Sequence, residues 1–485
     1  MRKIKKLLLG ITMVLAVLSF VFAFFYTALR YTPILGTKPP EFYSYPDYTQ
    51  ILTPQEMKED LRQLKADLEQ VHPATIYGLP ADMEAAFAEA ENKANQEMTV
   101  GEFAFLAAEL TCMLGDAHTG VMLGFGERLL PMEIKILDGK IFVLGGRNLY
   151  PGDQLLSLGG VTADEILAQA ERVLPAENPY WLKDYIRNML TESVLTQMGA
   201  EIDYMRGLDA EVLRNGETQV IRLEFGFTYE KADPYPERQF YPSNDSYQGY
   251  YLDQENSLCH FRLQSCIYDE EYVDFVRTMF QDIKNQGIEN IIVDLRGNYG
   301  GNTYVAQEFL KYIDIDEYKY FGSVRRMSRA ASEQRGYLAR KGTVTWEPET
   351  VTNQKAEELL FAGNIYTLID NGTFSAAKDF AVILADNGIG TIIGEPSGNA
   401  PNSYGDILSF QLQHSKLFYN ISYTQWMRPD EGLADADALY PHYQVTYTID
   451  DYINNRDLAM EEALKLIQGD YCLHPLPYLQ LQFPY

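Results

Sequence analysis

Residues 291–302 of the chain read Ile291-Ile292-Val293-Asp294-Leu295-Arg296-Gly297-Asn298-Tyr299-Gly300-Gly301-Asn302. The apolar, β-branched first part is typical of a strand buried on both faces of a parallel sheet. The second part is a glycine-rich turn, in which Gly300 and Gly301 can take positive φ and present backbone N–H groups to a ligand. Amide donors at the end of a buried strand suit an oxyanion hole. The sequence therefore predicts a buried strand that delivers an anion-stabilising loop.

Strand and helix patterns alternate on both sides of this strand. Strands are expected at 258–263, 290–295, 364–369 and 390–393, and helices at 270–285, 305–312 and 376–387. Alternation of this kind is what βαβ units require. The sequence therefore predicts an α/β domain over residues 245–470.

A serine lies where the third of these strands gives way to a helix. The stretch reads Leu368-Ile369-Asp370-Asn371-Gly372-Thr373-Phe374-Ser375-Ala376-Ala377-Lys378-Asp379-Phe380. At a helix N-terminus, the dipole and the free N–H groups favour developing negative charge near Ser375. The Ala376 N–H is then a second oxyanion donor. Taken alone, the stretch also fits a plain serine N-cap.

A histidine is framed by glycines in Leu114-Gly115-Asp116-Ala117-His118-Thr119-Gly120, just past a segment with helical periodicity. A side chain in such a position is presented rather than packed, and none of the other five histidines has comparable framing. Taken alone, this segment also fits a structural histidine.

The three segments, in this order, resemble the landmarks of the C-terminal-processing (tail-specific) serine peptidase family, including its tricorn-like branch. The family string "(V/I)-D-L-R-x-N-x-G-G" is matched at Val293, Asp294, Leu295, Arg296, Asn298, Gly300 and Gly301, the string around the serine at Gly372, Thr373, Ser375, Ala376 and Ala377, and "L-x-D-x-H-(S/T)" at Leu114–Thr119. The resemblance implies a ClpP/crotonase-like βαβ core. It also implies a serine endopeptidase that forms an acyl-enzyme on Ser375, with Gly300, Gly301 and Ala376 as the oxyanion hole and no metal or organic cofactor.

The general base is the point at which this chain leaves the commoner family pattern. Many members place a lysine 25 residues after the serine, and that position is Ala400 here. The tricorn-like branch uses a histidine and an acidic residue from the tail, which implies His118 as general base and Asp435 as orienting acid. Asp437 is the close alternative to Asp435.

Two further interpretations stay open. The stretch from Ser375 to Lys378 is a literal S-x-x-K, and the two side chains lie one helical turn apart. A desolvated lysine can serve as a base, so a Ser–Lys peptidase that uses Lys378 is one alternative. A non-catalytic peptide-binding protein on the same scaffold is the other, because the usual lysine is missing.

Residues 1–30 predict a transmembrane signal anchor. Arg2, Lys3, Lys5 and Lys6 precede 23 uncharged residues, 7–29. At 1.5 Å per residue this run spans the roughly 30 Å hydrocarbon core of a bilayer. Aromatic residues at its end favour an uncleaved anchor over a cleaved signal peptide. The basic flank stays inside, so we expect a single-pass protein of the cell membrane with its C-terminal bulk extracytoplasmic.

The remaining segments complete the expected domain organisation. Residues 31–52 are predicted to be a tether, 53–120 an N-terminal helical domain, 121–235 a β-rich module and 471–485 a C-terminal tail. Within the helical domain, residues 53–71 and 81–113 carry helical periodicity. Within the module, the stretch 152–160 resembles the end of a PDZ module, a fold that binds peptides by strand addition. We expect two strands there, at 132–136 and 141–144, and a helix at 163–172.

Charge and cysteine content limit the partners. The formal net charge is −28, and such a surface repels phosphate backbones, which excludes nucleic acid. A peptide or protein substrate and the membrane are the expected partners. The four cysteines fit no zinc pattern. Cys259 and Cys266 are expected either to form a disulfide or to be buried free thiols.

Overall fold

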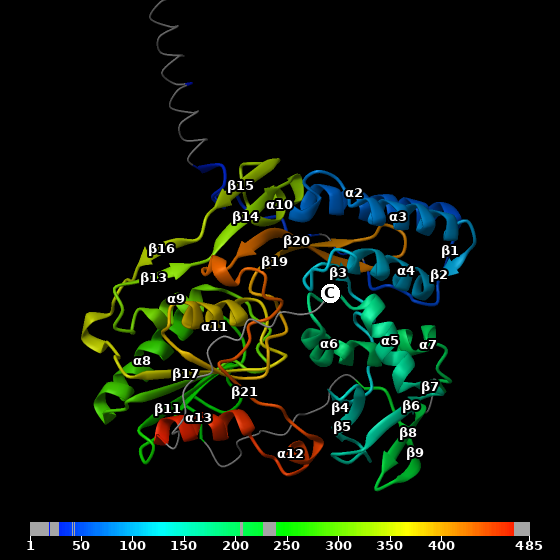
Figure 1. Cartoon of the computed structure of the whole chain (residues 1–485). Helices are drawn as coiled ribbons and strands as arrows, with labels where there is room; N and C mark the ends of the chain where they lie inside the picture. The colour runs from blue at the N-terminus through cyan, green and yellow to red at the C-terminus, as the bar shows by residue number, and fades with distance from the viewer. Residues whose placement is uncertain are drawn as a thin grey trace, which may run out of the picture.

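The computed structural model describes residues 19, 29–40, 42, 44–203, 207–226 and 239–469. The predicted anchor and the predicted C-terminal tail therefore lie almost wholly outside the described residues. Within the described part, no helix combines the length and the apolar character needed to cross a bilayer. The described chain forms a helical region, a β-rich module and an α/β core, which meet at the centre of the molecule (Figure 1).

The α/β core is built on a six-stranded sheet in the order β10-β11-β12-β17-β18-β21. From β11 onward, neighbouring strands are parallel, and β10 pairs antiparallel at one edge. The strands are β10 (Gln248–Asp253), β11 (Leu258–Leu263), β12 (Asn290–Asp294), β17 (Asn364–Ile369), β18 (Thr391–Gly394) and β21 (Tyr443–Gln444). The predicted α/β class is confirmed, and each predicted core strand is found within one or two residues.

Helices cover both faces of this sheet, which is why its central strands β11 and β12 are buried along their whole length. One hydrophobic cluster joins alternate strand residues to three helices, α8 (Glu270–Gln286), α9 (Tyr304–Leu310) and α11 (Ala376–Asp386). A second cluster joins the intervening residues, such as Ile292 and Leu368, to α13 (Leu458–Gln468). Strand β12 is buried at every position, as a strand between two helical layers must be.

A second sheet connects the core to the N-terminal helices. Its order is β15-β14-β20-β19, and the short strand β3 pairs with β20. The strands are β3 (Gly120–Val121), β14 (Gly322–Met327), β15 (Gly342–Trp346), β19 (Ser403–Gln411) and β20 (Phe418–Met427). The loop that carries His118 leads directly into β3, so this sheet fixes the loop beside the core.

The helical region contains α2 (Pro54–Val71), α3 (Ala81–Lys93) and α4 (Val100–Cys112). Capping boxes begin α2 at Thr53 and α4 at Thr99, since each threonine accepts from the N3 amide and the N3 glutamate accepts from the threonine. The continuous periodicity from 81 to 113 is thus two helices, separated by a turn and by β2. The short elements of this region and of the core periphery are β1 (Ile51–Leu52), β2 (Met98–Thr99), β13 (Glu317–Tyr320), β16 (Glu349–Thr352), α10 (Arg329–Arg335) and α12 (Ile449–Ile453).

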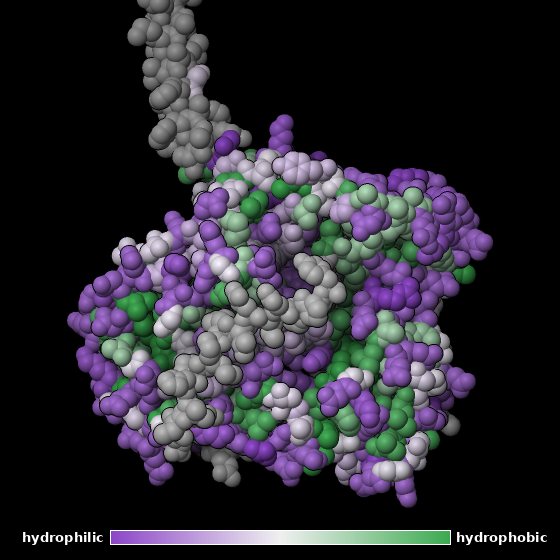
Figure 2. Space-filling model, viewed as in Figure 1, coloured by the Kyte–Doolittle hydropathy of each residue, from purple (hydrophilic) through white to green (hydrophobic). Residues whose placement is uncertain are grey.

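The β-rich module is a sheet in the order β4-β5-β6-β8-β9, with β7 paired to β6. Its elements are β4 (Met132–Leu137), β5 (Lys140–Gly146), β6 (Gln154–Leu158), β7 (Val161–Thr162), α5 (Ala163–Val173), α6 (Pro179–Tyr185), α7 (Glu192–Gln197), β8 (Leu208–Arg214) and β9 (Glu217–Leu223). The predicted hairpin and helix are confirmed, and peptide binding by this module stays a prediction. Hydrophobic residues show through a mainly hydrophilic face beside this module and α6 (Figure 2).

The cysteines in the core are reduced. Cys259 and Cys266 are both buried free thiols, so the second of the two expectations is confirmed and the disulfide is wrong. Burial raises the pKa of the Cys266 thiol to about 12, which makes it a poor nucleophile. Cys472 lies outside the described residues.

Candidate active site

Ser375 lies at the junction between β17 and α11 in a strained backbone conformation. Its φ is 52° and its ψ is −129°, a combination that residues with a side chain rarely adopt. Its hydroxyl does not cap the helix, so the plain N-cap interpretation is wrong. The neighbouring residues 371–374 and 376–380 are buried, whereas Ser375 is half-buried. A strained serine at the tip of a strand-to-helix turn is the geometry of a nucleophile.

Two loops meet around this serine, and each is fastened to the other. The Gly297 N–H donates to Asp370 Oδ1 (2.8 Å), and the Phe374 N–H donates to the Asn298 carbonyl (3.0 Å). The first loop follows β12 and the second follows β17, which are adjacent parallel strands. Their carboxyl ends therefore bring the glycine-rich loop to Ser375, as the sequence order predicted.

The glycine loop approaches the serine so closely that no side chain fits there. A Cβ on Gly300, whose φ is +93°, would lie 2.6 Å from Ser375 Cβ and 2.7 Å from the Ala376 nitrogen. The Gly300 N–H already donates to Asn298 Oδ1 (2.8 Å). Among the described residues, neither the Gly301 nor the Ala376 amide has a hydrogen-bond acceptor. Gly300 thus provides close approach, and the amides of Gly301 and Ala376 are free to donate.

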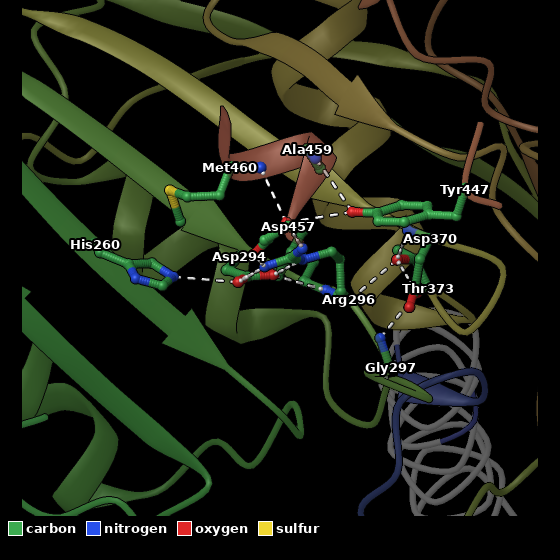
Figure 3. Close-up of polar contacts among 11 residues, drawn as sticks. His260, Asp294, Arg296, Gly297, Asp370, Thr373, Tyr447, Asp457, Ala459 and Met460 are labelled. Atoms are coloured by element: carbon green, nitrogen blue, oxygen red, sulfur yellow. Dashed lines mark hydrogen bonds and ion pairs between the residues drawn. The ribbon is translucent and has the colours of Figure 1, made fainter. Parts of the chain in front are cut away.

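The Asp-Leu-Arg part of the motif forms a buried ion-pair network at the end of β12 (Figure 3). The Arg296 guanidinium donates to Asp294 Oδ2 (2.7 Å) and to Asp457 Oδ1 (2.7 Å), and His260 Nε2 lies 3.1 Å from Asp294. Burial opposes ionisation of Asp294, but the charge and hydrogen bonds of Arg296 together with those of His260 outweigh it and hold the pKa of that carboxyl well below its usual range. Because Asp457 begins α13, the network fixes the loop that starts at Gly297 to the C-terminal helix.

His118 lies beside the nucleophile loop. Its ring is 4.5 Å from the ring of Phe374, the residue before the serine. Thr119 Oγ1 accepts the Ser422 N–H (2.9 Å) and so ties the histidine loop to β20. Both ring nitrogens of His118 are buried and have no hydrogen-bond partner within the described part of the chain. Burial lowers the pKa of His118 below 6.5, although Asp116 opposes the shift, so the imidazole is neutral at pH 7.

Asp116 holds the loop that carries His118 through two hydrogen bonds. It is fully buried, and its two oxygens accept from His72 Nε2 (3.1 Å) and from the His118 N–H (2.8 Å). His72 Nδ1 accepts the Ala74 N–H, which assigns the ring proton to Nε2. Burial opposes ionisation of Asp116, but the His72 hydrogen bond and the nearby imidazoles lower its pKa to about 2. Its carboxylate lies 3.8 Å from His118 Nδ1, beyond hydrogen-bond reach.

Glu177 is the residue that sequence reasoning missed. It lies between α5 and α6, and its Oε2 accepts from Asn399 Nδ2 (2.5 Å) and from the Ala400 N–H (2.9 Å). Single ligand atoms of Asp116, His118 and Glu177 lie within 4.8 Å of one another. Burial, reinforced by the Asp116 charge, raises the pKa of Glu177 to about 8. No motif marks this segment, so only the three-dimensional contact identifies it.

The composition of this trio also suits a divalent cation. However, both Asp116 oxygens are already committed to hydrogen bonds with His72 and with the His118 amide. Each of these oxygens keeps a further lone pair, so the geometry of the trio is compatible with proton transfer as well as with cation binding.

The two acidic residues expected from the tail lie elsewhere. Asp435 is exposed just past a short 3₁₀ turn, and among the described residues no hydrogen bond or ion pair joins it to His118. Asp437 is also exposed, and its carboxylate accepts from Tyr440 Oη (2.8 Å). The structure thus places the His118 ring against Phe374, the residue before Ser375, and brings neither predicted acid to it. Among the described residues, no hydrogen bond joins His118 to Ser375.

Lys378, the alternative base, is buried on α11 and committed to other groups. Its ammonium donates to Asp379 Oδ1 (2.6 Å), the Pro401 carbonyl (3.2 Å) and Ser403 Oγ (3.2 Å). No hydrogen bond to Ser375 is among its contacts in the described chain. An ammonium with three acceptors has its donors satisfied, so the geometry favours a structural role for this lysine.

The fold and the strained serine beside a buried histidine are those of a serine hydrolase. Residues 259–445 match the model of peptidase family S41. By this match, the α/β core of the chain is that of peptidase family S41, the C-terminal-processing serine peptidases.

Solved structures share this fold over most of the chain. The structure of mature CPAF complexed with lactacystin has a TM-score of 0.64 at 15% identity, over 86% of this chain and 99% of that chain. A crystal structure of mature CPAF has a TM-score of 0.63 at 14% identity, over 86% and 98%. The photosystem II D1 C-terminal processing protease has a TM-score of 0.43 at 12% identity, over 83% and 98%. No curated protein matches the sequence.

Proposed function

We propose that this chain is a serine endopeptidase that hydrolyses peptide bonds through an acyl-enzyme on Ser375. The observation that carries the proposal is the strained backbone of Ser375, which presents a half-buried side chain beside a close-packed glycine loop, while the His118 ring lies against the preceding Phe374. A backbone conformation of this kind costs free energy of folding, and such strained residues cluster at active sites.

The proposed chemistry follows from the positions of the donors and the acceptors. His118 takes the Ser375 proton as the hydroxyl oxygen attacks the peptide carbonyl, and the Gly301 and Ala376 amides stabilise the oxyanion. His118 then gives this proton to the leaving amine, and a water molecule hydrolyses the ester by the same route. Asp116 is close enough to stabilise the imidazolium by its charge, at 3.8 Å from Nδ1.

A serine-directed probe tests this proposal directly. The purified protein is incubated with a fluorophosphonate, or with lactacystin, the compound bound in the similar CPAF structure. We expect one covalent adduct per chain, located at Ser375 by peptide mass spectrometry, and no adduct in the Ser375→Ala variant. An intact mass that stays unchanged with both probes would favour the non-catalytic peptide-binding protein instead.

We propose further that the enzyme is anchored in the cell membrane with its C-terminal bulk outside the cytoplasm. The support is the four basic residues of 1–6 followed by the uncharged run 7–29. Protease added to intact cells should then release a large fragment that retains Ser375. A soluble protein whose N-terminus begins beyond residue 25 would instead indicate a cleaved signal peptide.

A further inference from the structure

A histidine base needs a carboxylate that fixes its tautomer and its orientation. We propose that Glu177 is this positioning residue for His118, supplied by the loop between α5 and α6. The inference rests on the proposed roles of Ser375 and His118. It assigns the acid to the inserted β-rich module and not to the C-terminal tail.

Glu177 is connected to both partners of the proton transfer. Its Oε2 is held by the Asn399 side chain and the Ala400 amide, and Asn399 Oδ1 accepts the Ser375 N–H (3.0 Å). One carboxylate oxygen is therefore coupled to the nucleophile loop through a single side chain. Among the described residues, the other oxygen, Oε1, is buried without a hydrogen-bond partner, and so are both nitrogens of the His118 ring. One ligand atom of Glu177 lies within 4.8 Å of one of His118, so an acceptor and a donor that both need a partner lie close together.

Asp116 already serves a structural purpose in the histidine loop. Each of its oxygens already accepts a hydrogen bond, and its nearest approach to a ring nitrogen of His118 is 3.8 Å. It contributes negative charge but leaves the ring free to turn. Glu177 Oε1, in contrast, accepts no hydrogen bond from the described residues and is available to a ring N–H of His118.

The segment that carries Glu177 is docked firmly on the core. Asn178 begins α6 by accepting the Trp181 N–H (3.0 Å) and donates to the Asp437 carbonyl (2.8 Å). The Trp181 ring stacks on Phe374 with the centroids 4.0 Å apart. These contacts of the following residues hold Glu177 in place. Glu177 also accepts the N–H of Ala400, the position at which many family members carry the lysine of the Ser–Lys dyad.

The position of Glu177 gives it a distinctive pH dependence. The ionisable groups that face it are Asp116 and His118 from the loop after α4, Lys378 from α11 and Tyr404 from β19. The ionised carboxylate accepts a ring N–H more strongly than the protonated acid, and only its negative charge stabilises the imidazolium. Burial and the Asp116 charge raise the pKa of Glu177 to about 8. The fraction of ionised Glu177 therefore increases as the pH rises through about 8. This second rise in kcat lies at higher pH than the first rise, which comes from deprotonation of His118.

The test compares Glu177→Gln with Glu171→Gln, an exposed glutamate on the last turn of α5. Gln keeps the size of the side chain but cannot ionise. We expect kcat for Glu177→Gln to fall by roughly 10²-fold or more with KM little changed, and the alkaline rise in the pH profile of kcat to disappear. Glu171→Gln should keep both.

Three outcomes overturn the assignment. The first is a wild-type kcat for Glu177→Gln, and the second is a reduced kcat that still rises through about pH 8. The third is a loss on Asp435→Asn as large as that expected for Glu177→Gln. Labelling of Ser375 by the fluorophosphonate is measured in parallel. If Ser375 of the Glu177→Gln variant is labelled and the variant turns over normally, only the role of Glu177 is rejected. Absence of labelling in the wild type rejects the proposed peptidase activity itself. A thermal unfolding midpoint near that of the wild type excludes simple misfolding.

Discussion

We expect Ser375→Ala to abolish cleavage of a susceptible peptide and to leave the fold intact. On this turn, residues 371–374 and 376–380 are buried, whereas Ser375 is half-buried and its hydroxyl oxygen can reach a substrate. The hydroxyl makes no capping bond to α11, so its removal costs the helix nothing at its N-terminus. Peptidase activity and thermal unfolding are measured on the same preparation. Turnover by the variant at the wild-type rate would show that another residue is the nucleophile.

Two companion variants separate the catalytic role from the local strain. Ser375→Gly should also be inactive, yet it should be about 1 kcal/mol more stable than Ser375→Ala, because glycine adopts φ 52° without steric cost. Ser328 is the matched control, since its Oγ does cap a helix and accepts the Ala331 N–H at 3.1 Å. Ser328→Ala should lose about 1 kcal/mol of stability and should retain full activity.

The sequence predicted the core well because local pattern and global fold agree there. The runs 290–294 and 364–369 are apolar and β-branched, and the structure buries β12 on both faces. The glycine loop and the serine turn follow adjacent parallel strands, so their order along the chain was enough to place them together. The continuous helical pattern from 81 to 113 was less informative, because the capping box at Thr99 starts a new helix that periodicity alone does not mark.

The acid partner of His118 could not be predicted, because it depends on a contact between distant parts of the chain. Glu177 and Asn399 are 222 residues apart, and no local pattern distinguishes Glu177 from its neighbours. The tail residue Asp435 was selected by analogy of position alone, and the structure leaves it exposed to solvent. Lys378 fits a short catalytic pattern, yet its burial and its pairing with Asp379 become visible only in three dimensions.

His118→Ala reduces kcat/KM by roughly 10³-fold or more, by analogy with the removal of the base from other triads. A neutral imidazole must accept the Ser375 proton, so wild-type activity first rises with pH through the His118 pKa. Burial lowers this pKa below 6.5, which places the first rise on the acidic side of neutrality. That rise should be absent from any residual activity of His118→Ala.

The competing lysine requires a variant that does not simply unfold. Lys378 and Asp379 form a buried ion pair. Removing Lys378 alone leaves the Asp379 carboxylate buried without its partner, which lowers the free energy of unfolding by about 3–5 kcal/mol. We therefore pair Lys378→Met with Asp379→Asn, which removes both charges and keeps the side-chain volumes similar. This double variant should retain most of the activity per folded molecule. If it is inactive while folded, and His118→Ala still cleaves peptide, the base is the lysine one turn after Ser375 and the enzyme is a Ser–Lys peptidase.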